Sequence, residues 1–185
     1  MDTLEQYQSV AGGFSVRLAG VGADQWSLPT PCTDWTVRDL AAHVISTHRG
    51  VLCSLEGGKP EEVDKEVDLT PEWRRASQAI IDALSDETKA AAVVGGMFGE
   101  QPFESLVGRL LCADTLVHSW DLARATGQDE QLDPAAVAAC AAFLAPIDEA
   151  IRRPGGFAPK IEPPGDADEQ TRLLCFCGRP SEPTI

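Results

Sequence analysis

The sequence predicts an all-α protein, an antiparallel bundle of four main helices with an extra helix. Apolar residues recur every three or four positions in several long segments, and glycine and proline fall between these segments. No region is rich in the alternating pattern of strands. The chain of 185 residues is 43% hydrophobic, so one domain can bury a sizeable core without disulfides.

The first helix is predicted over residues 3–19, where Thr3 is a suitable N-cap. Its apolar residues recur at helical spacing: Leu4, Tyr7, Val10, Ala11, Phe14 and Leu18. Residues 26–35 hold two prolines among small polar residues. They predict an irregular connection, because proline interrupts a regular backbone ladder.

Two further helices follow this connection. Thr36 is the expected cap of the second, which runs to about Ser54 and ends before the glycine and proline of residues 57–60. Thr70 is the expected cap of the third, with Pro71 at its first position. The apolar side of the third helix comprises Trp73, Ala76, Ala79, Ile80 and Leu84.

The second half of the chain predicts two more helices. Residues 90–102 contain three glycines and a proline, which favour a loop or short hairpin. The fourth helix is expected from about Phe103 until Gly127 stops it. Asp133 then caps a fifth helix that has Pro134 at its first position.

These elements predict the domain organisation. Residues 1–153 are expected to form the helical bundle, and residues 154–185 a short, irregular C-terminal tail that packs on it. The tail begins with proline and acidic residues and ends in an apolar run at residues 173–177. We expect this run to dock as a short extended or helical piece.

The charge of the chain argues against two classes of partner. Fifteen Lys and Arg against 29 Asp and Glu give a net charge of −14, which repels nucleic acid and anionic membranes. No apolar run approaches the roughly 20 residues that span a bilayer. Residues 1–5 lack the basic and then apolar start of a secretory signal. We therefore expect a cytoplasmic protein that binds neither nucleic acid nor membrane.

The six cysteines form no CxxC pair, so a disulfide framework is not expected. Four of them lie among apolar neighbours, as small core residues do. Cys175 and Cys177 flank Phe176, and such a CxC pair would bind metal or cycle between redox states in some settings. Packing is the favoured interpretation, because buried cysteines are usually inert.

The clearest chemistry lies in the fourth helix. Asp114 and His118 are four residues apart, which puts both side chains on one face. The imidazole of His43, on the second helix, would complete three protein ligands for a divalent cation and leave one position open. Side chains of facing helices converge in this way inside bundles.

The alternative is that these three residues only pack and hydrogen-bond. Histidine is often partly buried without binding a metal, and for either histidine alone packing is the better interpretation. Asp114 changes the balance, because a carboxylate among apolar residues costs free energy to bury unless something compensates its charge. A divalent cation would do so.

Three nearby polar residues have simpler interpretations than metal binding. His48 lies about 140 degrees around the helix from His43, so we expect a surface residue. Asp39 suits the first turn of a helix, with orientation of the imidazole as the alternative. Asp121 would either hold an imidazole or pair with Arg124 at the surface.

Two motifs resemble those of a known family. They read TPCTDWTVRDLAAH at residues 30–43, after Trp26, and DTLVHSWDLARATG at residues 114–127. They are similar to the mycothiol-dependent maleylpyruvate isomerase N-terminal domain group, within the DinB-like superfamily. The resemblance covers nearly the whole chain, because residues 157–159 and 173–179 are similar to the family's tail.

The resemblance implies a DinB-like four-helix bundle that binds a divalent metal, commonly Zn²⁺, with Ni²⁺ and Fe²⁺ as alternatives. The implied ligands are a histidine on the second helix and an acidic-x-x-x-His pair on a later one. These correspond to His43, Asp114 and His118 in this sequence. The family often has glutamate where Asp114 stands, which is longer by one methylene.

The resemblance also implies an activity with mycothiol, the low-molecular-weight thiol of actinobacteria. Coordination to zinc deprotonates a thiol near neutral pH, so we expect a metal-dependent mycothiol S-transferase with an electrophilic second substrate. A thiol-dependent isomerase is less favoured. The two-domain isomerases carry a further C-terminal domain, whereas this sequence ends in a short tail.

Other functions stay open at this point. One is a non-enzymatic, metal-stabilised module that binds a small molecule or a partner helix. Another is a non-haem iron oxygenase with two histidines and a carboxylate, which the resemblance does not favour. The oligomeric state also stays open, with a homodimer as one option. Specificity would come from loops near Trp35, Val94 and Met97, and Trp35 and Trp120 would shape the pocket.

Overall fold

The computed structural model describes residues 2–32, 34–95, 99–152 and 156–180. Its contacts divide the chain into two compact units, with the division between Gln131 and Leu132. The boundary expected after residue 153, between bundle and tail, stays a prediction.

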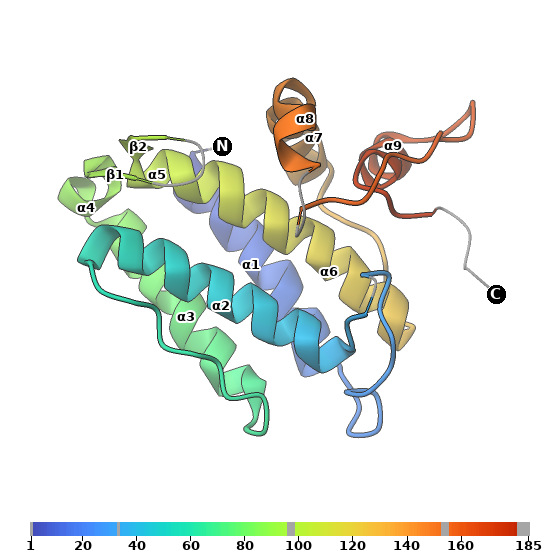
Figure 1. Ribbon diagram of the computed structural model, residues 1–185, viewed down its shortest axis with the longest axis horizontal. Helices are drawn as coiled ribbons and strands as arrows, with labels where there is room; N and C mark the ends of the chain where they lie inside the picture. Colours follow the sequence, from blue (N-terminus) through green and yellow to red (C-terminus); the bar gives the residue numbers. More distant parts are fainter. Residues whose placement is uncertain (1, 33, 96–98, 153–155, 181–185) are drawn as a thin grey trace. The chain divides into compact units, whose positions relative to one another are not determined.

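The first unit is built on four long helices (Figure 1). They are α1 (Thr3–Ala19), α2 (Val37–Glu56), α3 (Leu69–Ser85) and α6 (Cys112–Thr126). Helices α1 and α2 each contact both α3 and α6. The connection from α2 to α3 runs back along the bundle, so these two helices point in the same direction (Figure 1). The all-α helical bundle that the sequence predicts is confirmed, but it is not antiparallel throughout, because the long connection makes α2 and α3 parallel (Figure 1).

Aromatic and aliphatic side chains fill the space between these helices. Among the largest fully buried side chains are Tyr7, Phe14, Leu18, Leu40, Ile45, Trp73, Ile80 and Leu122. Burying each such side chain contributes about 1.5–3 kcal/mol. The indole N–H of Trp73 donates to Ser15 Oγ at 2.8 Å, so its polar atom is satisfied inside the core.

Side-chain caps begin α1, α2 and α3, and two of these caps differ from the prediction. Thr36 caps α2, as predicted. Helix α1 is capped by Asp2, and Thr3 is already its first helical residue. Helix α3 is capped by Asp68 and not by Thr70. In both cases an aspartate stands one or two residues before the threonine, and the two residue types are similarly good caps.

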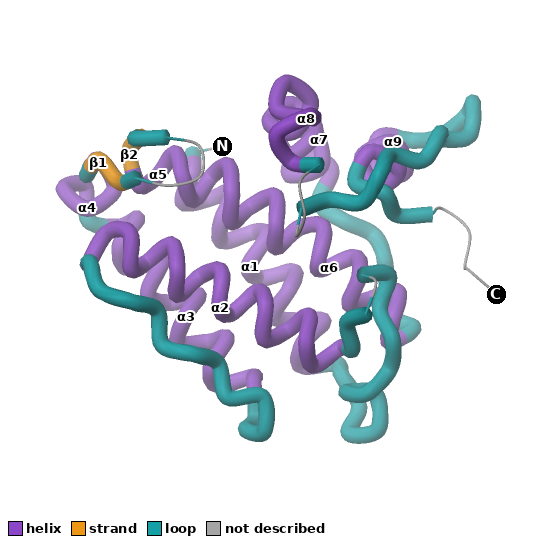
Figure 2. The backbone as a smooth tube through the Cα atoms, in the orientation of Figure 1, coloured by secondary structure: helices purple, strands orange, loops and turns teal. Residues whose placement is uncertain are grey.

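A short hairpin precedes the helix that carries Asp114. After α4 (Glu87–Ala91), strand β1 (Val93–Val94) pairs antiparallel with strand β2 (Gln101–Pro102). Figure 2 shows these two strands beside the helices of the first unit. Of the two alternatives for residues 90–102, the antiparallel pairing of β1 and β2 supports the hairpin.

The fourth predicted helix contains a π-helical turn. It begins as α5 (Phe103–Leu106), passes through the π turn η1 (Val107–Leu111) and continues as α6. Gly127 ends it in the left-handed conformation with φ 69°, as predicted. A π turn adds a residue to the helical repeat and is frequent at functional sites. Asp114 lies in the first turn after it, so the π turn sets the direction of that side chain.

The second unit is also helical. It comprises α7 (Pro134–Leu144), the 3₁₀ turn η2 (Ala145–Ile147), α8 (Asp148–Ile151) and α9 (Glu169–Phe176). Asp133 caps α7, as predicted. Helix α9 packs on α7 and shows that the C-terminal tail is not irregular throughout. Cys175 and Cys177 are both buried, in agreement with a packing role.

One stretch in the second unit is long and apolar. By length and composition alone, the 18 residues Pro134–Ile151 would be able to cross a bilayer. No such segment is expected from the sequence, in which the apolar runs are shorter. The stretch is broken by η2 and holds acidic residues in α8. Core helices pass the same test, so this stretch assigns the protein to no compartment.

Candidate metal centre

The structure brings the three predicted ligands together where α2 faces α6. His43 Nε2 lies 3.3 Å from Asp114 Oδ1, and His118 Nε2 lies 3.5 Å from the same oxygen. One donor atom from each of the three residues lies within 4.8 Å of the other two. The described residues thus contain a group that is able to hold one cation. That it binds a metal stays a prediction.

Local structure explains how each side chain reaches this cluster. Thr36 fixes the start of α2 through a capping box, and His43 follows about two turns later. Asp114 and His118 are one turn apart on α6, so they share a face. Helices α2 and α6 contact each other directly. The cluster therefore depends on the packing of two helices that are distant in sequence.

The cluster is enclosed at α6 and more open at α2. The side chains of Asp114 and His118 are 17% and 9% exposed, whereas that of His43 is 36% exposed. Asp114 Oδ2 is buried and has no hydrogen-bond partner among the described residues. An unpaired buried carboxylate oxygen costs free energy, and a bound cation would remove that cost.

Charges within the cluster stabilise one another. Burial raises the pKa of the Asp114 carboxyl, but His118 and His43 outweigh burial and hold that pKa well below its ordinary value. Burial lowers the pKa of the His118 imidazole. The carboxylate of Asp114, with smaller contributions from Asp121 and Cys32, outweighs this and raises the pKa well above 6.5. A cation at Nε2 would therefore replace a proton.

The donor set and its spacing fit a small divalent cation. Ligand atoms about 2.0–2.1 Å from a tetrahedral zinc lie about 3.3 Å from one another. The separations of 3.3 and 3.5 Å between the imidazole nitrogens and Asp114 Oδ1 are close to that spacing. Two imidazoles and a carboxylate suit Zn²⁺, Ni²⁺ or Fe²⁺. Three protein ligands would leave a position for an exogenous ligand on the side of His43.

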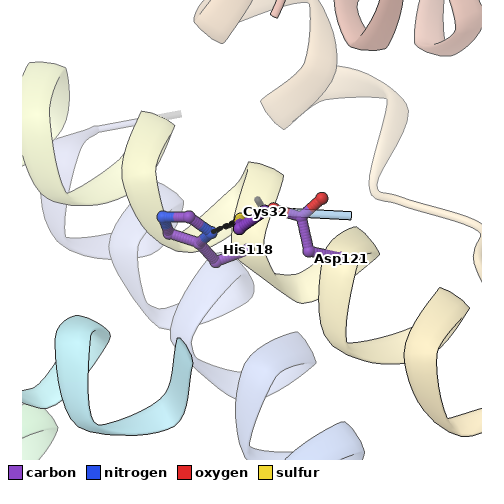
Figure 3. Close-up of side chains that lie close together, drawn as sticks. All are labelled: Cys32, His118 and Asp121. Carbon is purple, nitrogen blue, oxygen red and sulfur yellow. Dashed lines mark hydrogen bonds and ion pairs between the residues drawn. The ribbon is translucent and has the colours of Figure 1, made fainter. Parts of the chain in front are cut away.

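A second group of side chains supports His118 from the opposite side (Figure 3). His118 Nδ1 lies 3.0 Å from Asp121 Oδ2, and Cys32 Sγ donates to the same oxygen at 3.2 Å. The contact with His118 Nδ1 confirms that Asp121 holds an imidazole, and Asp121 is fully buried. The surface alternative is wrong, because Arg124 binds Glu130.

Cys32 has no predicted role in the sequence. Its position in the TPC segment of the first motif was the available signal, but nothing in the spacing links it to α6. Its Sγ lies 3.7 Å from His118 Nδ1, although 86 residues separate them. Only the tertiary structure shows this contact.

The prediction that His48 lies at the surface is wrong. Its side chain is fully buried, with ring centroids 5.8 Å from Tyr7 and 4.8 Å from Trp73. Helix α2 contacts α3 as well as α6, so the side of α2 away from the cluster is also covered. Burial lowers the pKa of His48 to about 4.

Asp39 has the capping role that the sequence favours. Its Oδ2 accepts hydrogen bonds from the backbone N–H of Thr36 at 3.0 Å and from Thr36 Oγ1 at 2.6 Å. Lys65 Nζ donates to Oδ1 at 2.6 Å. These bonds lower the pKa of the Asp39 carboxyl to about 2. Asp39 thus stabilises the start of α2.

One of the two tryptophans expected at the pocket lies against the cluster. The ring centroid of Trp35 is 4.6 Å from that of His43 and 5.8 Å from that of His118. Trp120 is buried, and Arg124 stacks on its ring at 4.6 Å. Of the loops expected to set specificity, Val94 lies in β1, and Met97 lies outside the described residues. Their role in specificity stays a prediction.

The fold and the cluster define a class of protein, a helical bundle with two histidines and a carboxylate grouped between two helices. The chain belongs to the mycothiol maleylpyruvate isomerase N-terminal domain family, whose model matches residues 11–123. This confirms the resemblance and is consistent with the DinB-like superfamily.

The similar proteins add no activity to this family assignment. The chain is 36% identical over 188 residues to uncharacterized proteins from two strains of Mycobacterium tuberculosis. The matches cover 97% of this chain and 98% of each relative. No solved structure gives a significant match.

Proposed function

We propose that the protein is a metal-dependent thiol S-transferase that uses mycothiol as its thiol substrate. The observation that supports this most is the cluster of His43, Asp114 and His118, which is more open at His43. Membership of a mycothiol-related family supports the choice of thiol. Zn²⁺ is the proposed metal, with Ni²⁺ and Fe²⁺ as alternatives, and the second substrate is an electrophile.

A divalent cation held by these residues would lower the pKa of a coordinated thiol and supply a thiolate at neutral pH. The charges of the protein ligands favour such an anion. Two neutral imidazoles and the carboxylate of Asp114 leave one positive charge of a divalent cation uncompensated. A thiolate neutralises this charge, whereas water does not.

The surroundings of the cluster suggest how the substrates approach. His43 is the most exposed of the three proposed ligands, so the thiol would enter on its side. Trp35 lies against both imidazoles and offers an aromatic wall beside this entry. The more enclosed Asp114 and His118 would keep their orientation while His43 faces solvent.

A non-enzymatic, metal-stabilised module is the second candidate. The unpaired Asp114 Oδ2 supports it, because a metal that fills a structural need requires no turnover. A thiol-dependent isomerase acting at the same site is a third. Titration of the zinc-loaded protein with mycothiol separates a closed structural site, which refuses an exogenous thiol, from an open one.

We also propose a cytoplasmic location without nucleic-acid or membrane partners, and a homodimer as one option. The net charge of −14 supports the first part of this proposal.

Metal analysis tests the ligand set. We expect about one zinc per chain in the wild type, and a loss of most of it in His118→Ala and Asp114→Ala. Asp82→Ala is the matched control, because Asp82 is an exposed carboxylate on α3 that accepts a hydrogen bond from Gln78, one turn away. Full zinc content in both cluster variants would contradict the assignment.

A conjugation assay tests the transferase activity. The purified protein is mixed with mycothiol and monobromobimane, and the uncatalysed rate is subtracted. We expect a protein-dependent rate that chelation removes, that zinc restores, and that His43→Ala lacks. A panel of chemically different electrophiles without any metal-dependent conjugate would leave the non-enzymatic module as the better proposal.

A further inference from the structure

We propose that Asp121 and Cys32 are positioning residues, which fix the ring of His118 so that Nε2 faces the metal position. This inference rests on the proposed metal site and adds two residues to it that do not bind the metal. It also connects the segment before α2 to the helix that carries two of the three ligands.

The geometry around Asp121 carries the proposal. Asp121 is fully buried on α6, three residues after His118. Its Oδ2 lies 3.0 Å from His118 Nδ1 and 3.2 Å from Cys32 Sγ. One carboxylate oxygen therefore receives hydrogen bonds from two side chains that come from different parts of the chain.

These contacts determine which nitrogen of His118 carries a proton. An ionised carboxylate only accepts hydrogen bonds, so Nδ1 of His118 must donate to Asp121. Nε2 is then the nitrogen that gives up its proton when a metal binds. In Figure 3 one ring nitrogen faces Cys32 and the other points away from it. That second nitrogen is Nε2, which lies 3.5 Å from Asp114 Oδ1.

Cys32 holds the carboxylate of Asp121 in place. Its thiol is the second donor to Oδ2, so the carboxylate has less freedom to rotate away from the imidazole. The backbone N–H of Cys32 donates to Thr30 Oγ1 at 3.2 Å, and the N–H of Thr30 donates to the carbonyl of Trp35 at 3.0 Å. The turn that places Cys32 thus also places Trp35 against the imidazoles.

A catalytic cysteine is a different interpretation of the same group, and the distances argue against it. A cysteine nucleophile needs an imidazole nitrogen that accepts the thiol proton. His118 Nδ1 already donates to Asp121 at 3.0 Å, and it lies 3.7 Å from Cys32 Sγ. The thiol is closer to the carboxylate, at 3.2 Å.

A second metal site is another interpretation, because Cys32, His118 and Asp121 also form a group with metal-ligand spacing. A metal there would have to displace the proton that joins Nδ1 to Asp121. The hydrogen bonds to Asp121 Oδ2 already satisfy that oxygen, whereas Oδ2 of Asp114 has no partner among the described residues. The unpaired oxygen marks the more favourable place for a cation.

Zinc affinity, measured by competition with a chromophoric chelator, tests the proposal without any assay of activity. Asp121→Asn keeps the size of the side chain and removes its charge. We expect it to bind zinc about 10–100-fold more weakly than the wild type. Cys32→Ala should weaken binding on the order of several-fold. Cys32→Ser should restore it to within about twofold, because a hydroxyl also donates a hydrogen bond.

Two variants serve as matched controls. Glu130→Gln removes a carboxylate that binds Arg124, and Cys53→Ala removes a half-buried thiol of α2. Both should bind zinc as the wild type does. Imidazole ¹H–¹⁵N spectra of the zinc-loaded protein add a second readout. A slowly exchanging Nδ1 proton on His118 should be present in the wild type and lost in Asp121→Asn.

The outcomes separate this inference from the proposed function. If the wild type binds no zinc, the proposed function fails and the role of both residues fails with it. If the wild type binds zinc and Asp121→Asn binds it equally well, only the positioning role is overturned. A second zinc equivalent that is lost in Cys32→Ala would overturn it in favour of a second metal site. If Asp121→Asn does not fold, equal affinities of Cys32→Ala and wild type would still refute the role of Cys32.

Discussion

His43 on α2 and Asp114 on α6 lie 3.3 Å apart, Nε2 to Oδ1, although 71 residues separate them. His118 approaches the same carboxylate oxygen from one turn further along α6. One carboxylate oxygen is thus placed between two imidazoles, while the other oxygen of Asp114 is buried and has no partner among the described residues. This arrangement is what a divalent cation would complete.

Metal binding should stabilise the fold through Asp114. Zinc that binds the folded state alone adds about 2.7 kcal/mol when its free concentration is 100 times its Kd. For a chain of this size that corresponds to a rise in Tm of roughly 5–10 °C. Thermal melts of wild type with zinc and with chelator measure the increment. Asp114→Asn should lack it, and Asp82→Asn should retain it; an equal increment in Asp114→Asn would exclude Asp114 as a ligand.

The stability of the folded protein should decrease as pH falls, because His48 is buried. Its pKa is lowered to about 4 in the folded state, mainly by burial, from 6.5. Between pH 4 and pH 6.5 the unfolded state therefore binds more protons than the folded state. The free energy of unfolding is thus highest above pH 6.5 and declines as pH falls toward 4. The full difference is worth about 3 kcal/mol.

Urea unfolding at pH 7 and pH 5, with chelator present, checks this dependence. His48→Phe preserves an aromatic ring between Tyr7 and Trp73 and removes the titrating group. Wild type should lose about 2 kcal/mol more than this variant between the two pH values. Identical pH slopes for the two proteins would show that His48 is not held neutral by burial.

The stability of the start of α2 should depend on the capping box of Thr36 and Asp39. Metal binding should not depend on this capping box. Thr36→Ala should destabilise the protein by about 0.5–2 kcal/mol, because the backbone N–H of Asp39 loses its acceptor. Chemical denaturation measures the loss. Zinc per chain in Asp39→Asn should match the wild type, since this carboxylate contacts Thr36 and Lys65. A large loss of zinc would mean that Asp39 orients His43 after all.

Trp35 should report occupancy of the proposed site. Its ring lies 4.6 Å from that of His43, so coordination of this imidazole should change the indole emission. Zinc titration followed by tryptophan fluorescence should give a saturable change in the wild type. Trp35→Phe should lose most of this change. Trp26→Phe is the control, because Trp26 stacks with Arg38 instead; loss of the signal in that variant alone would place the metal elsewhere.

Much of the fold could be predicted because its signals are local. The caps Thr36 and Asp133, the stop at Gly127 and the apolar faces of the long helices each depend on residues within a few positions of one another. Where two local signals compete, prediction failed, as at Thr70, where Asp68 caps α3. The π turn before α6 has no such signal and was not predicted.

The sequence by itself determined the helical class, the family and the residue types of the proposed site. The spacing of Asp114 and His118 already places both on one helical face, because residues four positions apart in an α-helix lie on the same side. The tertiary structure decided which residues meet across helices. It buried His48 where helical spacing alone predicts a surface residue, and it placed Cys32 against Asp121 across 89 positions. Such contacts depend on how helices and loops pack, and a single sequence holds no local record of that packing.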